Sequence, residues 1–360
     1  MTGGPALTDG FTTRGAANRP ISASTSVRGN ADRRASRRLA WAELLRLPAL
    51  FTVPGDALAG AAATATTPNS RTLLAIGSSL CLYEAGMALN DWADQDEDAA
   101  ERPHRPLPSG RIHPTAALTT ACVLTGAGLA LAARAGRPAL AVAAPLAATV
   151  WAYDLTLKHT AAGPPAMAAA RSLDLLLGAA ATAGRIHEAL PSAALLGTHT
   201  LAVTTVSRQE TTGGSPMPPL AALATTALLT RLLTRRPPAG PRDAATHGLP
   251  GTGTDTGTGS DTGTGTAPPT RSGNHSSRPF TDTLRLALAA TYAGTAARRY
   301  FHAALNPSPP LTQRAVGGGI RATIPLQAAL TARSGAGPTA VLIAALAPLG
   351  RRFARKVSVT

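Results

Sequence analysis

The sequence is poor in charged and aromatic side chains and in cysteine. Of its 360 residues, 15% are charged, 3% are aromatic and two are cysteines. A soluble domain carries about 25% charged residues, so the composition favours a membrane protein, with a soluble Ala-rich helical bundle as the alternative. Few aromatic rings leave no platform for stacking bases, so the net charge of +15 indicates a membrane surface as partner and no nucleic acid. Cys81 and Cys122 have no metal-ligand spacing.

What the chain has in abundance is long apolar stretches. Several are shorter than the roughly 20 residues that span a bilayer, but flanking Ala, Gly and Thr extend most of them to that length. They cover residues 41–64, 73–89, 116–133, 140–151, 167–183, 190–206, 220–233, 284–297, 315–332 and 340–349. The pattern predicts an all-α, polytopic transmembrane bundle of about nine to ten membrane helices.

Polar tracts interrupt this pattern and suggest the domain organisation. Residues 1–38 are basic and rich in Ser, Gly and Thr, which predicts a disordered cytoplasmic tail. Residues 39–356 form the predicted membrane domain, and the Gly/Thr-rich residues 237–281 are expected to form a flexible loop inserted between helices. Because arginines at 33, 34, 37 and 38 precede the first span, the positive-inside rule predicts a multi-pass protein of the cell membrane with its N-terminus in the cytoplasm.

The densest acidic cluster of the chain lies in NDWADQDED, Asn90 to Asp98, after the second apolar stretch and on the predicted cytoplasmic side. Asp91, Asp94 and Asp98 are spaced i, i+3 and i+7, so they share one face of a helix end, and Asn90 joins that face. Asp96 and Glu97 are expected to point elsewhere. Three carboxylates and an amide oxygen suit a hard cation such as Mg²⁺, which shares its coordination shell with phosphate oxygens.

A basic turn follows the acidic cluster directly. Arg102 and Arg105 can contact the phosphate groups of a metal–diphosphate complex, which explains why opposite charges lie so close together in the sequence. The alternative is a solvated acidic loop that its own arginines neutralise. The one-face spacing favours the metal site, since a solvated loop has no need of it.

The motif NDWADQDED resembles the N-D-x-x-D-x-x-x-D motif of UbiA-type intramembrane prenyltransferases, and ERPHRPLPSGRI is similar to the sequence that follows it in that family. The resemblance extends from about Trp41 to Lys356 and is greatest to the EboC-like branch. Three segments suggest that branch: residues 153–179, 207–214 and 314–330. The resemblance implies a ring of nine helices around a central cavity, and Mg²⁺-dependent transfer of a prenyl group from a polyprenyl diphosphate to a small, often aromatic acceptor.

The resemblance also implies roles for residues outside the first motif. Lys158 corresponds to a diphosphate-binding lysine, and Tyr153 lies one residue before the family's tyrosine, whose position Asp154 holds. The family's second aspartate-rich motif is reduced here to Glu210, which we expect to bind metal. Arg208 is expected to contact the diphosphate and to replace part of a second metal's charge. Lys158, Arg208 and Tyr153 are therefore the predicted catalytic residues.

Two polar residues of the predicted spans allow two interpretations. Arg171 is expected either to bind the diphosphate or to form a structural ion pair with Asp174, and ionisable groups inside a membrane face the bundle interior. His199 is expected to form an interhelical hydrogen bond, with a role as a ligand as the alternative. Two other functions stay open beside the transferase: a membrane-embedded terpene cyclase of the same fold, and a non-catalytic membrane component that binds prenyl diphosphates.

Overall fold

The computed structural model describes residues 37–211, 213–235 and 277–357. All secondary structure in these residues is helical, which confirms the predicted all-α class. The predicted tail, apart from residues 37 and 38, and most of the predicted loop lie outside the described residues. The elements are η1 (Leu47–Thr52), α2 (Pro54–Ala63), α3 (Ser70–Ala93), α4 (Gln95–Glu101), α5 (Pro114–Ala135), α6 (Arg137–Ala152), η2 (Tyr153–Leu157), α7 (Gly163–Ala183), η3 (His187–Ala189), α8 (Leu190–Ser207), α9 (Met217–Thr234), α11 (Ser277–Leu305), α12 (Pro309–Arg333) and α13 (Gly337–Val357).

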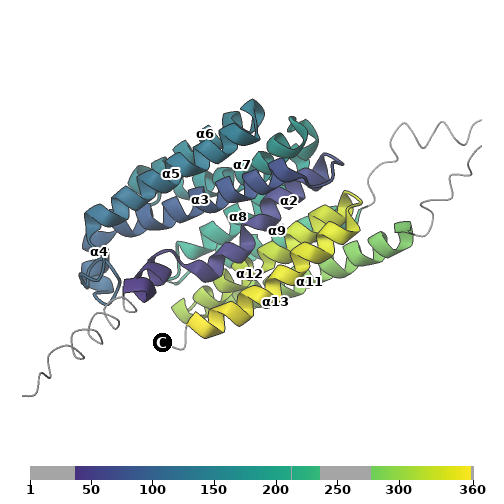
Figure 1. The fold of residues 1–360 in the computed structure, drawn as a ribbon. Helices are drawn as coiled ribbons and strands as arrows, with labels where there is room; N and C mark the ends of the chain where they lie inside the picture. Colours follow the sequence, from purple (N-terminus) through teal and green to yellow (C-terminus); the bar gives the residue numbers. More distant parts are fainter. Residues whose placement is uncertain (1–36, 212, 236–276, 358–360) are drawn as a thin grey trace, which may run out of the picture.

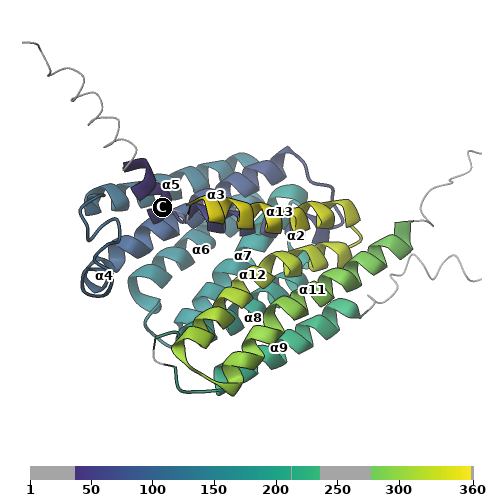
Figure 2. The same cartoon turned by 90° about the horizontal axis from the view of Figure 1, so that it is seen from below.

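The long helices pack largely in chain order (Figures 1 and 2). Helix α3 packs on α5, and each later helix packs on its successor as far as α13. The two ends of the bundle then meet, because α13 packs against η1 and α12 packs against α2. Helix α11 begins at Ser277, inside the last residues of the predicted loop.

The first predicted span is not one continuous helix, which corrects the expectation for residues 41–64. Residues 37–44 are helical, Arg46 then adopts a left-handed conformation (φ 48°), and η1 and α2 follow as separate segments. Proline lacks the backbone N–H that an uninterrupted helix needs, and prolines stand at positions 48 and 54. The break leaves the Thr52 carbonyl to accept hydrogen bonds from Arg171 (3.3 Å) and Gln327 (2.8 Å).

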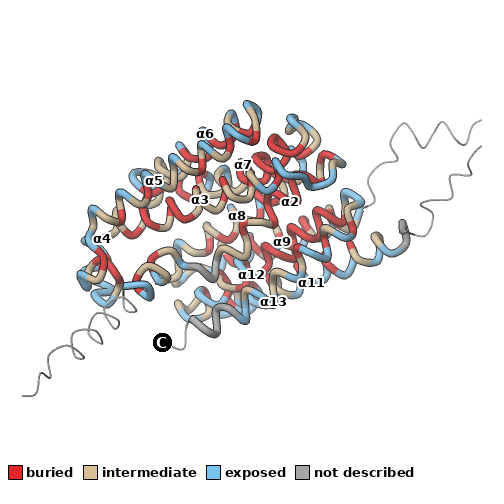
Figure 3. The backbone as a smooth tube through the Cα atoms, viewed as in Figure 1, coloured by how far each residue is buried: buried red, intermediate tan, exposed pale blue. Residues whose placement is uncertain are grey.

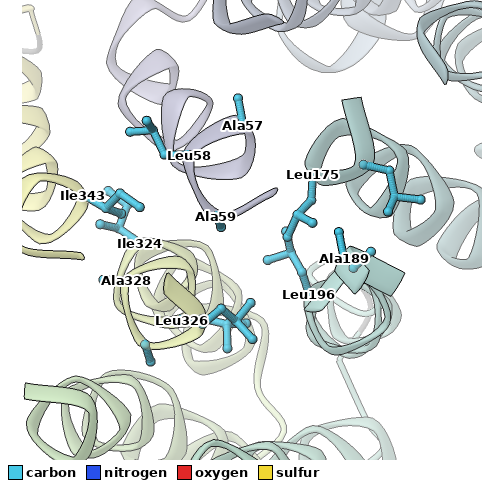
Figure 4. Packing of buried hydrophobic residues seen from close by; sticks show 14 of the residues in the cluster. Ala57, Leu58, Ala59, Leu175, Ala189, Leu196, Ile324, Leu326, Ala328 and Ile343 are labelled. Carbon is cyan, nitrogen blue, oxygen red and sulfur yellow. The ribbon is translucent and has the colours of Figure 1, made fainter. Parts of the chain in front are cut away.

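Helix α2 is the most deeply buried element of the bundle. Its residues 55–62 are all buried (Figure 3), and Asp56 is the one charged residue among them. It lies between α7 and α12, where Ala57, Leu58 and Ala59 face Leu175 on one side and Ile324 on the other (Figure 4). The backbones of α2 and α7 touch, because a Cβ at Gly60 would lie 2.0 Å from the Leu175 carbonyl oxygen. Small residues permit such close approach between membrane helices.

His199 links three helices through hydrogen bonds. Its Nδ1 lies 3.2 Å from the Tyr292 hydroxyl on α11, and its Nε2 lies 3.1 Å from the Gly319 carbonyl oxygen on α12. The predicted interhelical hydrogen bond of His199 is therefore confirmed.

Five described helical segments are long and apolar enough to cross a membrane. They are Ser70–Ala93, Pro114–Ala135, Arg137–Leu157, Gly163–Ala183 and His187–Ser207. Helices α11, α12 and α13 are of similar or greater length but carry several arginines. The predicted number of nine to ten spans therefore stays a prediction.

Candidate diphosphate and metal site

The acidic motif lies where α3 passes into α4. Helical hydrogen bonding continues through the junction: the Asp94 N–H donates to the Asn90 carbonyl (3.0 Å) and the Asp98 N–H donates to the Asp94 carbonyl (2.8 Å). The expected helical register is thereby kept. Asp91 and Asp98 are buried and Asp94 is partly buried, whereas Asp96 is exposed.

Cations from two different segments contact these carboxylates. An Asp91 oxygen lies 3.3 Å from Arg46, in the break before η1, and 3.7 Å from Arg105, in the basic turn. Arg105 also lies 2.6 Å from Asp98, and Arg102 lies 3.7 Å from the same carboxylate. The predicted association of the acidic motif with Arg102 and Arg105 is thus present in the structure.

A further cation reaches the motif from a third segment, the loop after α6. Lys158 directly follows the π-helical turn η2. Its N–H donates to the Tyr153 carbonyl (2.9 Å), five residues earlier. Lys158 forms an ion pair with Asp94. Asp94, Glu97 and His159 each place one potential ligand atom within 4.8 Å of the others. Glu97 therefore does not point away from the motif as expected, since α4 turns it toward the loop that carries His159.

Behind the acidic motif lies a cavity of about 320 Å³ between α3, α6 and α7. Asn90, Tyr153 and Asp154 line it together with Arg46. The Asn90 side-chain amide donates to an Asp154 carboxylate oxygen (3.2 Å), which leaves the amide oxygen of Asn90 for another partner. The rest of the lining is mostly aliphatic, with Ser79, Arg171 and Asp174 as its further polar groups, so the cavity joins an acidic, basic-rimmed mouth to a largely aliphatic interior.

The loop after α8 lies beside this group of charges. Arg208 is exposed and donates to the Thr160 carbonyl, two residues after Lys158. Glu210 is partly buried, and burial raises its pKa above 4.5, an effect that the Arg102 guanidinium partly offsets. Arg102 thus acts electrostatically on Glu210 and also lies 3.7 Å from Asp98. Direct metal binding by Glu210 stays a prediction.

Arg171 lines the cavity but is held in place by other groups. Its guanidinium lies 3.1 Å from a carboxylate oxygen of the fully buried Asp56, which also accepts from Gln327 (2.6 Å). The expected partner Asp174 instead accepts a hydrogen bond from Ser79. Arg171 therefore forms a structural ion pair, but its salt-bridge partner is Asp56 and not Asp174 as we expected. The diphosphate contact of Arg171 stays a prediction.

Sequence reasoning missed Arg46, Asp154 and His159 as parts of the site. Arg46 is far from the motif in sequence, and only the break before η1 turns it toward Asp91. Asp154 stands at the position of a family tyrosine. The change from an aromatic ring to a carboxylate was a signal in the sequence for a hydrogen bond at this position, which Asn90 donates.

The donor set of the site fits a hard divalent cation. Carboxylate oxygens of Asp91, Asp94 and Asp98 and the amide oxygen of Asn90 are the ligand types that Mg²⁺ prefers. Each of the three carboxylates is in contact with a lysine or arginine, and such cations pair as readily with phosphate oxygens. A metal–diphosphate complex could therefore replace these ion pairs. The carboxylates would bind the metal, and the lysine and arginines would bind the phosphate oxygens.

Comparison with known proteins agrees with this arrangement. The model of the UbiA prenyltransferase family matches residues 49–234, just over half of the chain. A digeranylgeranylglyceryl phosphate synthase of Methanopyrus kandleri is 33% identical over 126 residues, which are 34% of this chain and 45% of that protein. The synthase of Ignicoccus hospitalis is 32% identical over 145 residues, 40% of this chain and 48% of that protein. The chain thus aligns with less than half the length of these relatives.

Solved structures show the same fold. A digeranylgeranylglyceryl phosphate synthase structure aligns with 83% of this chain and 98% of its own, at 16% identity and a TM-score of 0.54. A UbiA homologue of Archaeoglobus fulgidus, solved with GPP and Mg²⁺, covers 83% of this chain and 99% of its own, at 16% identity and a TM-score of 0.52. The resemblance to the EboC-like branch stays a prediction. The acidic motif, the helical bundle and the family match lead to one conclusion: the chain is a multi-pass membrane protein of the UbiA prenyltransferase family.

Proposed function

We propose that this protein is a Mg²⁺-dependent intramembrane prenyltransferase that acts on a polyprenyl diphosphate and a small acceptor. One observation carries the proposal: three aspartates of one motif meet cations from three separate segments at the mouth of an apolar cavity. We place the protein in the cell membrane with this mouth on the cytoplasmic side, because α4 lies at the same end of the bundle as the start of the described chain, where arginines 37 and 38 precede the first apolar stretch (Figure 1).

Mg²⁺ bound by Asn90, Asp91, Asp94 and Asp98 would supply positive charge to the leaving diphosphate. Lys158 and Arg105 already lie beside these carboxylates and would pair with the phosphate oxygens that enter between them. Arg102 and Arg208 extend the positive charge toward the loop after α8. Stabilising a charge that develops in the transition state accelerates its formation.

The reaction breaks the bond between the allylic carbon and the diphosphate oxygen, and the electron pair leaves with the diphosphate. The cavity holds the resulting carbocation away from water, since its lining behind Asn90 is largely aliphatic. Tyr153, at the boundary between charges and apolar lining, faces the place where the cation forms. The acceptor then supplies an electron pair to the carbon and loses a proton.

The cavity lining favours transfer over cyclisation. A cyclase guides a carbocation through several rearrangements and tends to use aromatic rings to stabilise it. The cavity has two aromatic residues, Tyr83 and Tyr153, and its other apolar lining is aliphatic. Reaction with a separate acceptor molecule is therefore a simpler outcome than cyclisation for a carbocation in such a cavity.

The test uses the purified protein in lipid nanodiscs with labelled geranyl, farnesyl and geranylgeranyl diphosphates, with and without Mg²⁺. We expect Mg²⁺-dependent release of diphosphate together with a prenylated acceptor in a membrane extract. Asp94→Ala should abolish release, whereas Asp96→Ala, which changes an exposed carboxylate outside the site, should leave it within about twofold of the parent.

Three other results would count against the proposal. Diphosphate release with a cyclic hydrocarbon or alcohol would identify a cyclase. Binding without release would identify a non-catalytic prenyl-diphosphate-binding component, for which the reduced second motif is the main argument. Equal damage by Asp94→Ala and Asp96→Ala would show that the helical register does not define the site.

A further inference from the structure

A second and larger cavity, of about 730 Å³, lies between α11, α12, α13 and η1. It shares no lining residue with the cavity behind the acidic motif. No aspartate or glutamate lines it, but six basic side chains do: Arg298, Arg299, His302, Arg314, Arg321 and Arg351. Among the described residues, none of these five arginines forms a salt bridge with a carboxylate.

These basic side chains are all exposed, and the arginines gather around one cavity without a carboxylate to offset their mutual repulsion. Arg321 lies twelve residues into α12, roughly 18 Å along the helix from its first residue. The charged groups that act on it are Arg299 and Arg351, which are cations as well. A cavity lined by cations alone attracts an anionic group, because its positive potential is not offset by acidic side chains. An anionic ligand would supply the charge that the described part of the chain does not.

The glycine run of α12 makes room for one arginine of this cluster. A Cβ at Gly318 would lie 2.4 Å from the Cδ of Arg299, and a Cβ at Gly317 would lie 3.4 Å from a guanidinium nitrogen of Arg321. Glycine at position 318 thus allows the Arg299 side chain to lie against the backbone of α12, whereas a Cβ at position 317 would make only an ordinary contact with Arg321. The proposed prenyl transfer does not use the segment RAVGGGIRA. In this cavity the segment makes room for an arginine side chain.

Apolar residues complete the cavity. Phe51, Leu311, Ile320, Ile324 and Ala347 line it beside the arginines. The combination suits an amphiphile, because guanidinium groups bind phosphate oxygens in a bidentate manner and the aliphatic lining accepts an acyl or prenyl chain. We propose that this cavity binds the phosphate group of an anionic membrane lipid, with the lipid's apolar chain along α12.

The cavity lies close to the candidate active site. Thr52 lines it, and the carbonyl of the same residue accepts from Arg171, which lines the other cavity. The loop after α8 also meets the start of α12, because the Gly214 N–H donates to the Pro307 carbonyl (2.9 Å). A lipid bound here would therefore lie beside η1, the segment that separates the two cavities.

The test compares lipid retention by the full chain and its variants. The protein is purified in neutral detergent, mixed with equal amounts of phosphatidylglycerol and phosphatidylcholine, and analysed by native mass spectrometry. The cavity variant Arg299→Gln/Arg321→Gln/Arg351→Gln is compared with Arg37→Gln/Arg38→Gln/Arg352→Gln. This control removes three exposed arginines that do not line the cavity, at the same end of the bundle (Figure 1).

We expect the parent and the control to retain phosphatidylglycerol preferentially, and the cavity variant to lose that preference by about tenfold or more, since each arginine contributes severalfold to binding an anionic lipid. A second arm adds inorganic phosphate at millimolar concentration. Displacement of the lipid by phosphate, absent in the cavity variant, would assign the site to free phosphate, and no displacement would assign it to lipid.

Assignment to free phosphate would overturn the proposal, and so would either of two further results: an unchanged preference in the cavity variant, or an equal loss in the cavity variant and the control. Equal loss would mean that general surface charge attracts the lipid. If the triple cavity variant does not fold, Arg321→Gln measured against Arg352→Gln gives the same comparison with a single charge, and Arg321→Lys should retain part of the preference.

Discussion

Replacing Arg171 by methionine tests whether this residue is a structural partner of Asp56 or a ligand of the diphosphate. In the structure its guanidinium lies 3.1 Å from the Asp56 carboxylate, which is 0% exposed. With an effective dielectric constant of about 20, that separation gives an attraction of about 5 kcal/mol. Removing one partner of a buried pair leaves a charge without compensation and costs about 3–5 kcal/mol. We therefore expect Arg171→Met to lower the free energy of unfolding by about this amount.

The measurement is unfolding in mixed detergent–dodecyl sulfate micelles, followed by far-UV circular dichroism. Arg134→Met is the matched control, because Arg134 is exposed, lies in the last turn of α5 and has no described carboxylate partner; it should change stability by less than about 0.5 kcal/mol. Asp56→Asn keeps an oxygen that can accept from Gln327, so Arg171→Met/Asp56→Asn should recover about 1–3 kcal/mol of the loss.

One result would refute this reasoning. If Arg171→Met unfolds at the same dodecyl sulfate fraction as the parent and binds geranyl diphosphate much more weakly, then the ion pair with Asp56 contributes little and Arg171 is a substrate ligand. If the variant is destabilised and the double variant binds the diphosphate normally, Arg171 holds η1 and α2 in place and does not contact the substrate.

Three further predictions follow from particular contacts. Gly60→Leu should prevent formation of a folded, monodisperse protein in detergent, measured by size-exclusion chromatography, because a Cβ at this position would overlap the Leu175 carbonyl oxygen at 2.0 Å; a folded variant would contradict the α2–α7 contact. His199→Leu should cost about 1–3 kcal/mol in the same unfolding assay, since it leaves the buried Tyr292 hydroxyl without this partner. Burial raises the pKa of Glu210 above 4.5, so this carboxylate should be protonated early as the pH falls. Mg²⁺-dependent diphosphate binding by the parent should therefore decrease with a midpoint above pH 4.5. A Glu210→Gln variant with the same pH profile would exclude Glu210 from the site.

The sequence determined the fold class and the centre of the candidate site. Apolar stretches of membrane-spanning length with few charges specify helices in a bilayer, because only helices and closed barrels satisfy their own backbone hydrogen bonds there. The spacing of Asp91, Asp94 and Asp98 also predicted which carboxylates share one helix face, since local hydrogen bonding continues from α3 into α4.

Tertiary structure alone decided which cations meet these carboxylates and which charges pair elsewhere. Arg46 reaches Asp91 only because the chain breaks before η1, and Arg171 pairs with Asp56 across 115 residues of sequence because α2 packs against α7. Spacing along one helix fixes neighbours three and four residues apart, but partners on different helices depend on how the helices cross. The second cavity has the same origin, since its arginines belong to three helices, and Arg299 of α11 lies against α12 where Gly318 leaves room for it.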